Sequence, residues 1–129
     1  MVTTTYVGPD FALAEEVLEA LDEAKFPITV AMWLLQLERS DRWKLVIATP
    51  IYDKLGPLAS YRRVIDALST KGPVSMVDLP IRLESTRRPL IRALRKMFGN
   101  VPLGKGIHLE SRSIGGTSID DGYLYRIKP

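Results

Sequence analysis

The single histidine of this chain and the carboxylates near it are the residues best suited to acid–base or metal chemistry. His108 and Glu110 are two positions apart on a predicted strand, so they share one face of it. Asp120 and Asp121 are predicted in the connection between the last two strands. Together, imidazole and carboxylate groups could move protons or hold a divalent metal. The set lacks the i, i+4 histidine pair of specific metal motifs, so exposed hydrogen-bonding groups are the simpler interpretation.

A run of basic residues is the strongest charged feature of the sequence. Residues 82–106 carry seven basic side chains against one acidic side chain, that of Glu84. A basic helical face can follow the phosphates of a nucleic acid without reading its sequence. Basic side chains in the last turns of a helix also complement its macrodipole and cover apolar surface, which is a purely structural role. The candidate contact residues are Arg87, Arg88, Arg92, Arg95, Lys96 and Lys105.

The segment 99–106, GNVPLGKG, satisfies the first seven positions of the phosphate-binding pattern GxxxxGK[ST]. Gly106 stands where the pattern needs a hydroxyl group to hold Mg²⁺. The segment also follows a predicted helix and precedes a predicted strand, whereas the motif requires a strand before it and a helix after it. We therefore expect an irregular connection with a solvated lysine.

Residue types exclude several kinds of active site. The chain has no cysteine, which excludes disulfides, thiolate metal sites and cysteine nucleophiles. It has no GxSxG nucleophile elbow, and its one histidine follows no triad pattern. Trp33 and Trp43 fall in a predicted hairpin, where aromatic side chains pack across strands. We expect no catalytic residue, no metal and no cofactor.

Hydrophobic spacing and turn residues predict a single α+β domain with the element order α-β-β-α-β-α-β-β. The first helix is capped by Asp10 and ends before Pro27, and the second opens at Gly56-Pro57 and ends at Lys71-Gly72-Pro73. The third is capped by Ser85 or Thr86, has Pro89 in its first turn, and ends at Gly99. Predicted strands cover residues 28–38, 43–49, 76–84, 107–113 and 123–128, with Gly115-Gly116 and Asp121-Gly122 as turns between the last two.

The expected sheet has about five strands and is mixed or mainly antiparallel. Residues 28–38 are apolar at odd and even positions, which predicts a strand buried on both faces. If the strands joined through the second and third helices all run in one direction, right-handed crossovers place both helices on one face. The other face then needs the first helix or a second copy of the chain.

Charge is unevenly distributed although the formal net charge is only +3. Residues 1–41 carry eight acids against two bases, a net of −6, and residues 82–106 carry a net of +6. An acidic helix could face a basic helix within one molecule, subunits could meet head to tail, or the basic run could bind an anionic partner.

We expect a single soluble domain over residues 1–129, with residues 1–8 disordered and with no signal peptide or membrane span. A cytoplasmic location fits the absence of cysteine. The favoured function is a small non-enzymatic binding or assembly module that acts through self-association, as a homodimer, and through protein contacts. The alternative is a nucleic-acid-binding accessory protein that uses the basic third helix.

Overall fold

A computed structural model describes residues 9–70, 80–99, 101 and 106–128 of the chain. The predicted class and element order are confirmed, because three helices alternate with five strands as α-β-β-α-β-α-β-β. The helices are α1 (Phe11–Glu23), α2 (Pro50–Ser69) and α3 (Pro89–Phe98). The strands are β1 (Val30–Leu35), β2 (Lys44–Ala48), β3 (Ile81–Glu84), β4 (Ile107–Ile114) and β5 (Thr117–Ile127). The predicted disorder of residues 1–8 and the first positions of the strand predicted at 76–84 lie outside the described residues.

The five strands form one mixed sheet with the spatial order β3-β2-β1-β5-β4. β2 and β3 are parallel, and the other three neighbouring pairs are antiparallel. β1 therefore lies at the centre of the sheet, and all six of its residues are buried, as its two-sided apolar sequence predicts.

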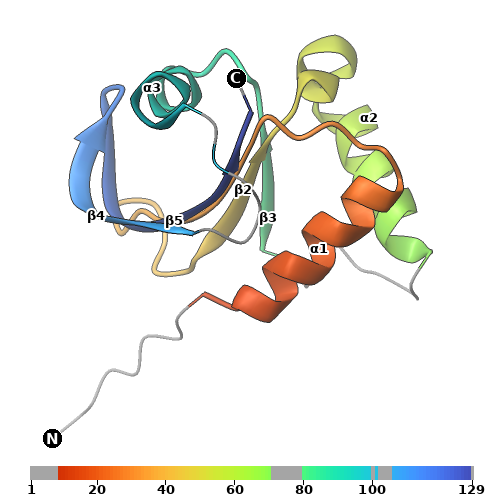
Figure 1. The fold of residues 1–129 in the computed structure, drawn as a ribbon, viewed down its shortest axis with the longest axis horizontal. Helices are drawn as coiled ribbons and strands as arrows, with labels where there is room; N and C mark the ends of the chain where they lie inside the picture. The colour runs from red at the N-terminus through yellow and green to blue at the C-terminus, as the bar shows by residue number, and fades with distance from the viewer. Residues whose placement is uncertain (1–8, 71–79, 100, 102–105, 129) are drawn as a thin grey trace, which may run out of the picture.

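Two hydrophobic cores lie on opposite faces of the sheet, and each is covered by helices of the same chain (Figure 1). α1 and α2 pack on Ala31 and Trp33 of β1. α3 packs on the other face, against Val30 and Met32. The strand buried on both sides is thus accounted for within one molecule and does not by itself require a second copy.

α2 and α3 lie on opposite faces of the sheet. The condition for finding both on one face was that the strands joined through them run in one direction, and this condition is not met. β4 is antiparallel to β5, and so runs opposite to β2 and β3. The connection through α3 joins β3 at one edge of the sheet to β4 at the other edge. It is therefore not a crossover between strands of the same direction, and the handedness rule does not place its helix.

α2 begins earlier than predicted. Thr49 caps its first turn by accepting a hydrogen bond from Ile51 N at 3.2 Å, and Pro50 occupies the first helical position. Gly56 interrupts the helix with φ 80° and ψ 177°, so the predicted start at Pro57 is the start of its second part. A kink at a Gly-Pro pair follows from the conformational freedom of glycine and the missing proline N–H.

The predicted N-cap of α3 is wrong, whereas its predicted end at Gly99 is confirmed. The N-cap is Arg88, which makes no side-chain capping hydrogen bond, while Pro89 takes the first turn as predicted. Ser85 and Thr86 instead bind the carboxylate of Asp53 on α2. Their hydroxyls tie the loop before α3 to another helix and do not cap the helix that follows.

The predicted turn at Asp121-Gly122 is also wrong, because both residues lie inside β5. The turn between β4 and β5 is Gly115-Gly116, with φ 57° and 78°. A Cβ atom at Gly122 would lie 3.2 Å from the carbonyl oxygen of Trp33, so glycine here allows close approach of β1 and β5.

α1 is anchored to the sheet by a charged pair. The guanidinium of Arg126, which is buried, donates hydrogen bonds of 2.7 and 2.6 Å to the two carboxylate oxygens of Asp22. Hydrogen bonding by Arg126 lowers the pKa of Asp22. None of the helices in the described part of the chain is both long and apolar enough to cross a lipid bilayer.

Candidate binding surfaces

His108 and Asp121, two of the candidate acid–base residues, are in contact. The Nε2 atom of His108 lies 2.6 Å from Oδ1 of Asp121. His108 pairs with Tyr123 across β4 and β5, and the two rings stack with centroids 4.4 Å apart and planes 9° apart. The imidazole is therefore held in one orientation by a carboxylate and a ring, while its side chain remains 43% exposed.

Tyr123 is the centre of a partly exposed group of rings that we call the aromatic patch, defined as Phe11, Trp43, His108 and Tyr123. Phe11 contacts Tyr123 edge-on at 5.0 Å and 89°, and Trp43 lies 5.9 Å from it at 41°. Phe11 is 44% exposed. The patch brings together the first residue of α1, the residue before β2, and two paired strands, on the side of the sheet covered by α1 and α2.

The other two residues of the predicted cluster have different positions. Glu110 is exposed and lies directly opposite Asp121 in the β4–β5 register, so two carboxylates face each other. Asp120 accepts a hydrogen bond of 2.6 Å from Leu37 N, in the loop after β1. Across the residues that the structure describes, no group of three histidine, aspartate or glutamate side chains could hold a metal ion.

The basic residues of α3 divide into exposed and occupied side chains. Arg92 and Lys96 are exposed and Arg95 is half-buried. They lie on the solvent side of the helix, opposite the fully buried Leu94. We call these three residues the basic face. Lys105 lies outside the described residues.

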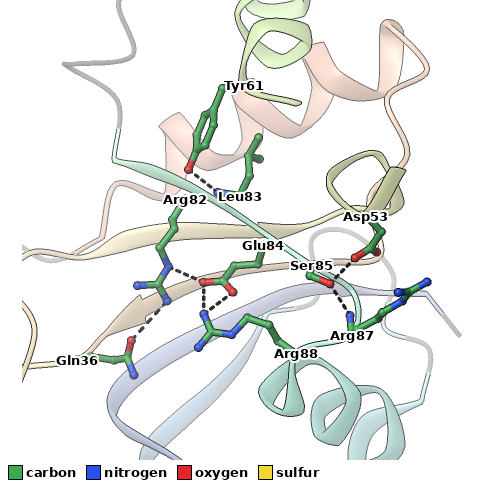
Figure 2. A network of polar contacts seen from close by, with 9 residues as sticks. All are labelled: Gln36, Asp53, Tyr61, Arg82, Leu83, Glu84, Ser85, Arg87 and Arg88. Atoms are coloured by element: carbon green, nitrogen blue, oxygen red, sulfur yellow. Dashed lines mark hydrogen bonds and ion pairs between the residues drawn. The ribbon is translucent and has the colours of Figure 1, made fainter. Parts of the chain in front are cut away.

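Arg88 belongs to a partly buried charged network at the end of β3, which Figure 2 shows. Its Nη1 donates a hydrogen bond of 2.6 Å to Oε1 of Glu84, whose side chain is only 6% exposed. Nε of Arg82 lies 2.8 Å from the same carboxylate, at an angle unsuited to a hydrogen bond. Nη2 of Arg82 also donates to Oε1 of Gln36 at 3.4 Å. Arg88 is therefore engaged with Glu84 and is less available to a partner than Arg92.

Asp53 forms a second network beside the first (Figure 2). Its carboxylate accepts hydrogen bonds from both hydroxyls of Ser85 and Thr86 and from Thr86 N. Burial acts to raise the pKa of Asp53, but these hydrogen bonds and the charge of Arg87 outweigh it and lower the pKa. The loop that positions α3 is thus fixed by carboxylates from α2 and β3.

Tyr125 lies beneath Phe11 in the core and is 6% exposed. Burial is the main reason that its pKa is raised, and the charges of Glu15 and Asp10 add to the effect. Those two carboxylates therefore lie near the aromatic patch, and they add negative charge to the side of the molecule on which Glu110 and Asp121 lie.

The aromatic patch and the Asp53 and Glu84 networks were not predicted from the sequence. Tyr123 alternates with buried residues and has the pattern of an ordinary strand position, and Phe11 and Trp43 are far from it in the chain. No sequence signal marks Phe11 as exposed, because it shares the apolar helical spacing of Ala14 and Leu18.

Comparison with known proteins gives no assignment: no family model, no curated protein and no solved structure matches this chain.

Proposed function

We propose that this protein is a non-enzymatic binding and assembly module that associates with copies of itself through protein contacts, a pair being the smallest assembly. The observation that supports the proposal most directly is the placement of opposite charge on opposite faces of one sheet.

α1 carries five acidic residues and no basic residue, and the surface of α3 presents Arg92, Arg95 and Lys96. The two helices are separated by the sheet. The acidic helix therefore does not contact the basic one within the molecule. The exposed charges of both helices face solvent, where a second copy of the chain could meet them. Complementary potentials steer association and select its orientation.

If the face covered by α3 in one copy contacts the face covered by α1 in another copy, the two copies associate head to tail. Such a contact leaves one face of each terminal copy free, so that pairs can extend to chains or close into rings. Each exposed ion pair contributes only about 0.2–1 kcal/mol, so the association should be weak and sensitive to salt.

Sedimentation equilibrium over a wide concentration range tests the proposal. We expect the average mass to rise with concentration at low ionic strength and to fall when salt is added. A monomer at every concentration and salt level would refute self-association.

A second candidate is nucleic-acid binding by the basic face, which is favoured by the exposure of Arg92 and Lys96. Phosphate backbones bind such surfaces through charge alone. The ratio of absorbance at 260 and 280 nm in the purified protein separates the candidates, because co-purified nucleic acid raises it.

A further inference from the structure

The strongest unexplained feature on the acidic side of the molecule is the pair of carboxylates beside the aromatic patch. Glu110 and Asp121 are directly opposite each other in the β4–β5 register. Side chains in this relation are about 4.5–5.5 Å apart at Cβ, and like charges there are destabilising. Of these two carboxylates, the one that His108 contacts is that of Asp121, while Glu110 is exposed. A cation placed between the two carboxylates would relieve their repulsion.

The rings next to these carboxylates also suit a cation. A guanidinium or ammonium group is attracted to the face of a tyrosine, tryptophan or phenylalanine ring within about 6 Å. Phe11 presents a ring that is 44% exposed at this site and contacts Tyr123, which in turn contacts Trp43. Carboxylates beside aromatic rings form a surface that is complementary to arginine and lysine side chains.

The basic face provides a matching arrangement. Lys96 follows Arg92 by four positions on α3, so the two side chains are neighbours on one side of the helix, about 5–6 Å apart at Cβ. That spacing is similar to the spacing of Glu110 and Asp121. Arg95, on the adjoining part of the helix surface, adds a guanidinium group that could reach a ring.

We infer that the basic face of one copy docks on the aromatic patch of a second copy, with Arg92 and Lys96 against Glu110 and Asp121. This inference rests on the proposed function and names the two surfaces that carry it. The occupant is a second copy because the same chain presents matching charges and spacing on its opposite face.

Two variants test the inference, each altering one surface without touching the core. The first, Arg92→Gln with Lys96→Gln, removes two charges from the basic face. The second, Glu110→Gln, removes one charge from the carboxylate pair beside the aromatic patch. Each variant alone should self-associate more weakly, by roughly two- to fivefold for each ion pair or cation–π pair that the substitution removes. Phe11→Ala is an additional variant that alters the aromatic patch itself, and it is used after its thermal unfolding shows that it folds.

A mixture of the two variants gives the decisive measurement. Each variant retains one intact surface, so the basic face of the Glu110→Gln variant can still dock on the patch of the other variant. A head-to-tail contact therefore predicts that an equal mixture forms pairs with the wild-type dissociation constant. The two altered surfaces then face outward, so no larger species should form. The matched control is Arg62→Gln with Arg63→Gln, which removes two exposed charges from α2 and should leave association unchanged.

The outcomes separate the inference from the function on which it rests. If wild-type protein associates and the variants do so equally well, self-association stands and the docking surfaces are wrong. The same conclusion follows if only one of the two variants is weakened, or if the mixture stays monomeric. A wild-type protein that never associates refutes both.

Discussion

The carboxylate of Glu84 is almost fully buried, yet two arginines share it. A buried charge is costly unless it is paired and hydrogen-bonded, and removing one partner costs more than the pair contributes. Burial lowers the pKa of Arg82, and the charge of Glu84 opposes that effect. The network is therefore a structural support for the loop that leads into α3, and its arginines should not be counted with the exposed basic residues.

The lowered pKa of Asp53 predicts how the stability of the fold depends on pH. Its pKa is lowered below the ordinary value of 3.8, so the folded state binds its proton less readily than the unfolded state. The carboxylate therefore stabilises the fold above that ordinary pKa, and the contribution is lost as the pH falls through the lower, folded-state pKa.

We expect Asp53→Asn to lower the free energy of unfolding by about 1 kcal/mol at pH 7, because hydrogen bonds to a charged acceptor are lost. The difference from wild type should shrink as the pH falls toward 3, in urea unfolding measured across the acid range. Asp66→Asn, on the exposed surface of α2, is the control and should have little effect. A difference independent of pH would contradict the role of the ionised carboxylate.

Neither of these networks could be predicted from the sequence. Ser85 and Thr86 precede a proline-containing helix start, and such residues most often cap the helix that follows. Their binding to Asp53 depends on the approach of that residue of α2, which lies more than thirty residues earlier in the chain. Long-range contacts of polar side chains leave no periodic signal.

The amphipathic face of α3 was predictable, because apolar residues recur at helical spacing. Leu94 is fully buried and Arg92 is exposed, in agreement with that pattern. The sheet face on which α3 packs was not predictable, since it depends on the direction and edge position of β4. Local periodicity identifies the buried side of a helix, but strand order decides what it packs against.

Leu94→Ala should lower the free energy of unfolding by about 2–5 kcal/mol, because a fully buried leucine leaves a cavity. Arg92→Ala should change it by less than about 0.5 kcal/mol, as expected for an exposed position. Denaturant unfolding of the two variants measures both values. Equal losses would mean that the helix packs through a different side.

The β4–β5 turn packs closely against the start of α3. A Cβ atom at Gly115 would lie 2.5 Å from the carbonyl oxygen of Pro89, whereas one at Gly116 would meet nothing within 4 Å. Both glycines have positive φ, so alanine at either costs about 1–2 kcal/mol in backbone strain.

Gly115→Ala should be less stable than Gly116→Ala by about a further 1–3 kcal/mol, since the turn must also move away from α3. Thermal and urea unfolding of the pair isolate this contact, because the backbone strain is common to both. Similar stabilities would show that the turn does not press on the start of α3.

Composition and the order of the elements predicted the fold class of the whole molecule. They did not predict that the acidic α1 and the basic α3 lie on opposite faces of the sheet. The sequence allowed an acidic helix to neutralise a basic one within the molecule. The arrangement in space excludes this, because the sheet lies between α1 and α3. The same arrangement explains the central strand without a second molecule. The proposed association therefore rests on charge and not on apolar burial.

Charge also determines what salt should do to any complex with nucleic acid. Each phosphate neutralised on a duplex contributes a slope of about −0.9 to the plot of log affinity against log salt. Arg88 is occupied by Glu84, so Arg92, Arg95 and Lys96 are the α3 residues free to contribute, and they predict a slope of about −2.7.

Substituting Arg92 and Lys96 with glutamine should reduce that slope by about 1.8 and leave the stability nearly unchanged, because exposed charges contribute little to folding. The sequence has no helix-turn-helix, zinc-finger or aromatic RNA-binding signature, so we expect no submicromolar complex at physiological salt. Fluorescence anisotropy with a labelled duplex, titrated at several salt concentrations, measures both quantities. Arg62→Gln with Arg63→Gln is again the control. A submicromolar, salt-sensitive complex that is lost in the α3 variant and kept in the control would make nucleic acid, and not a second copy, the partner of the basic face.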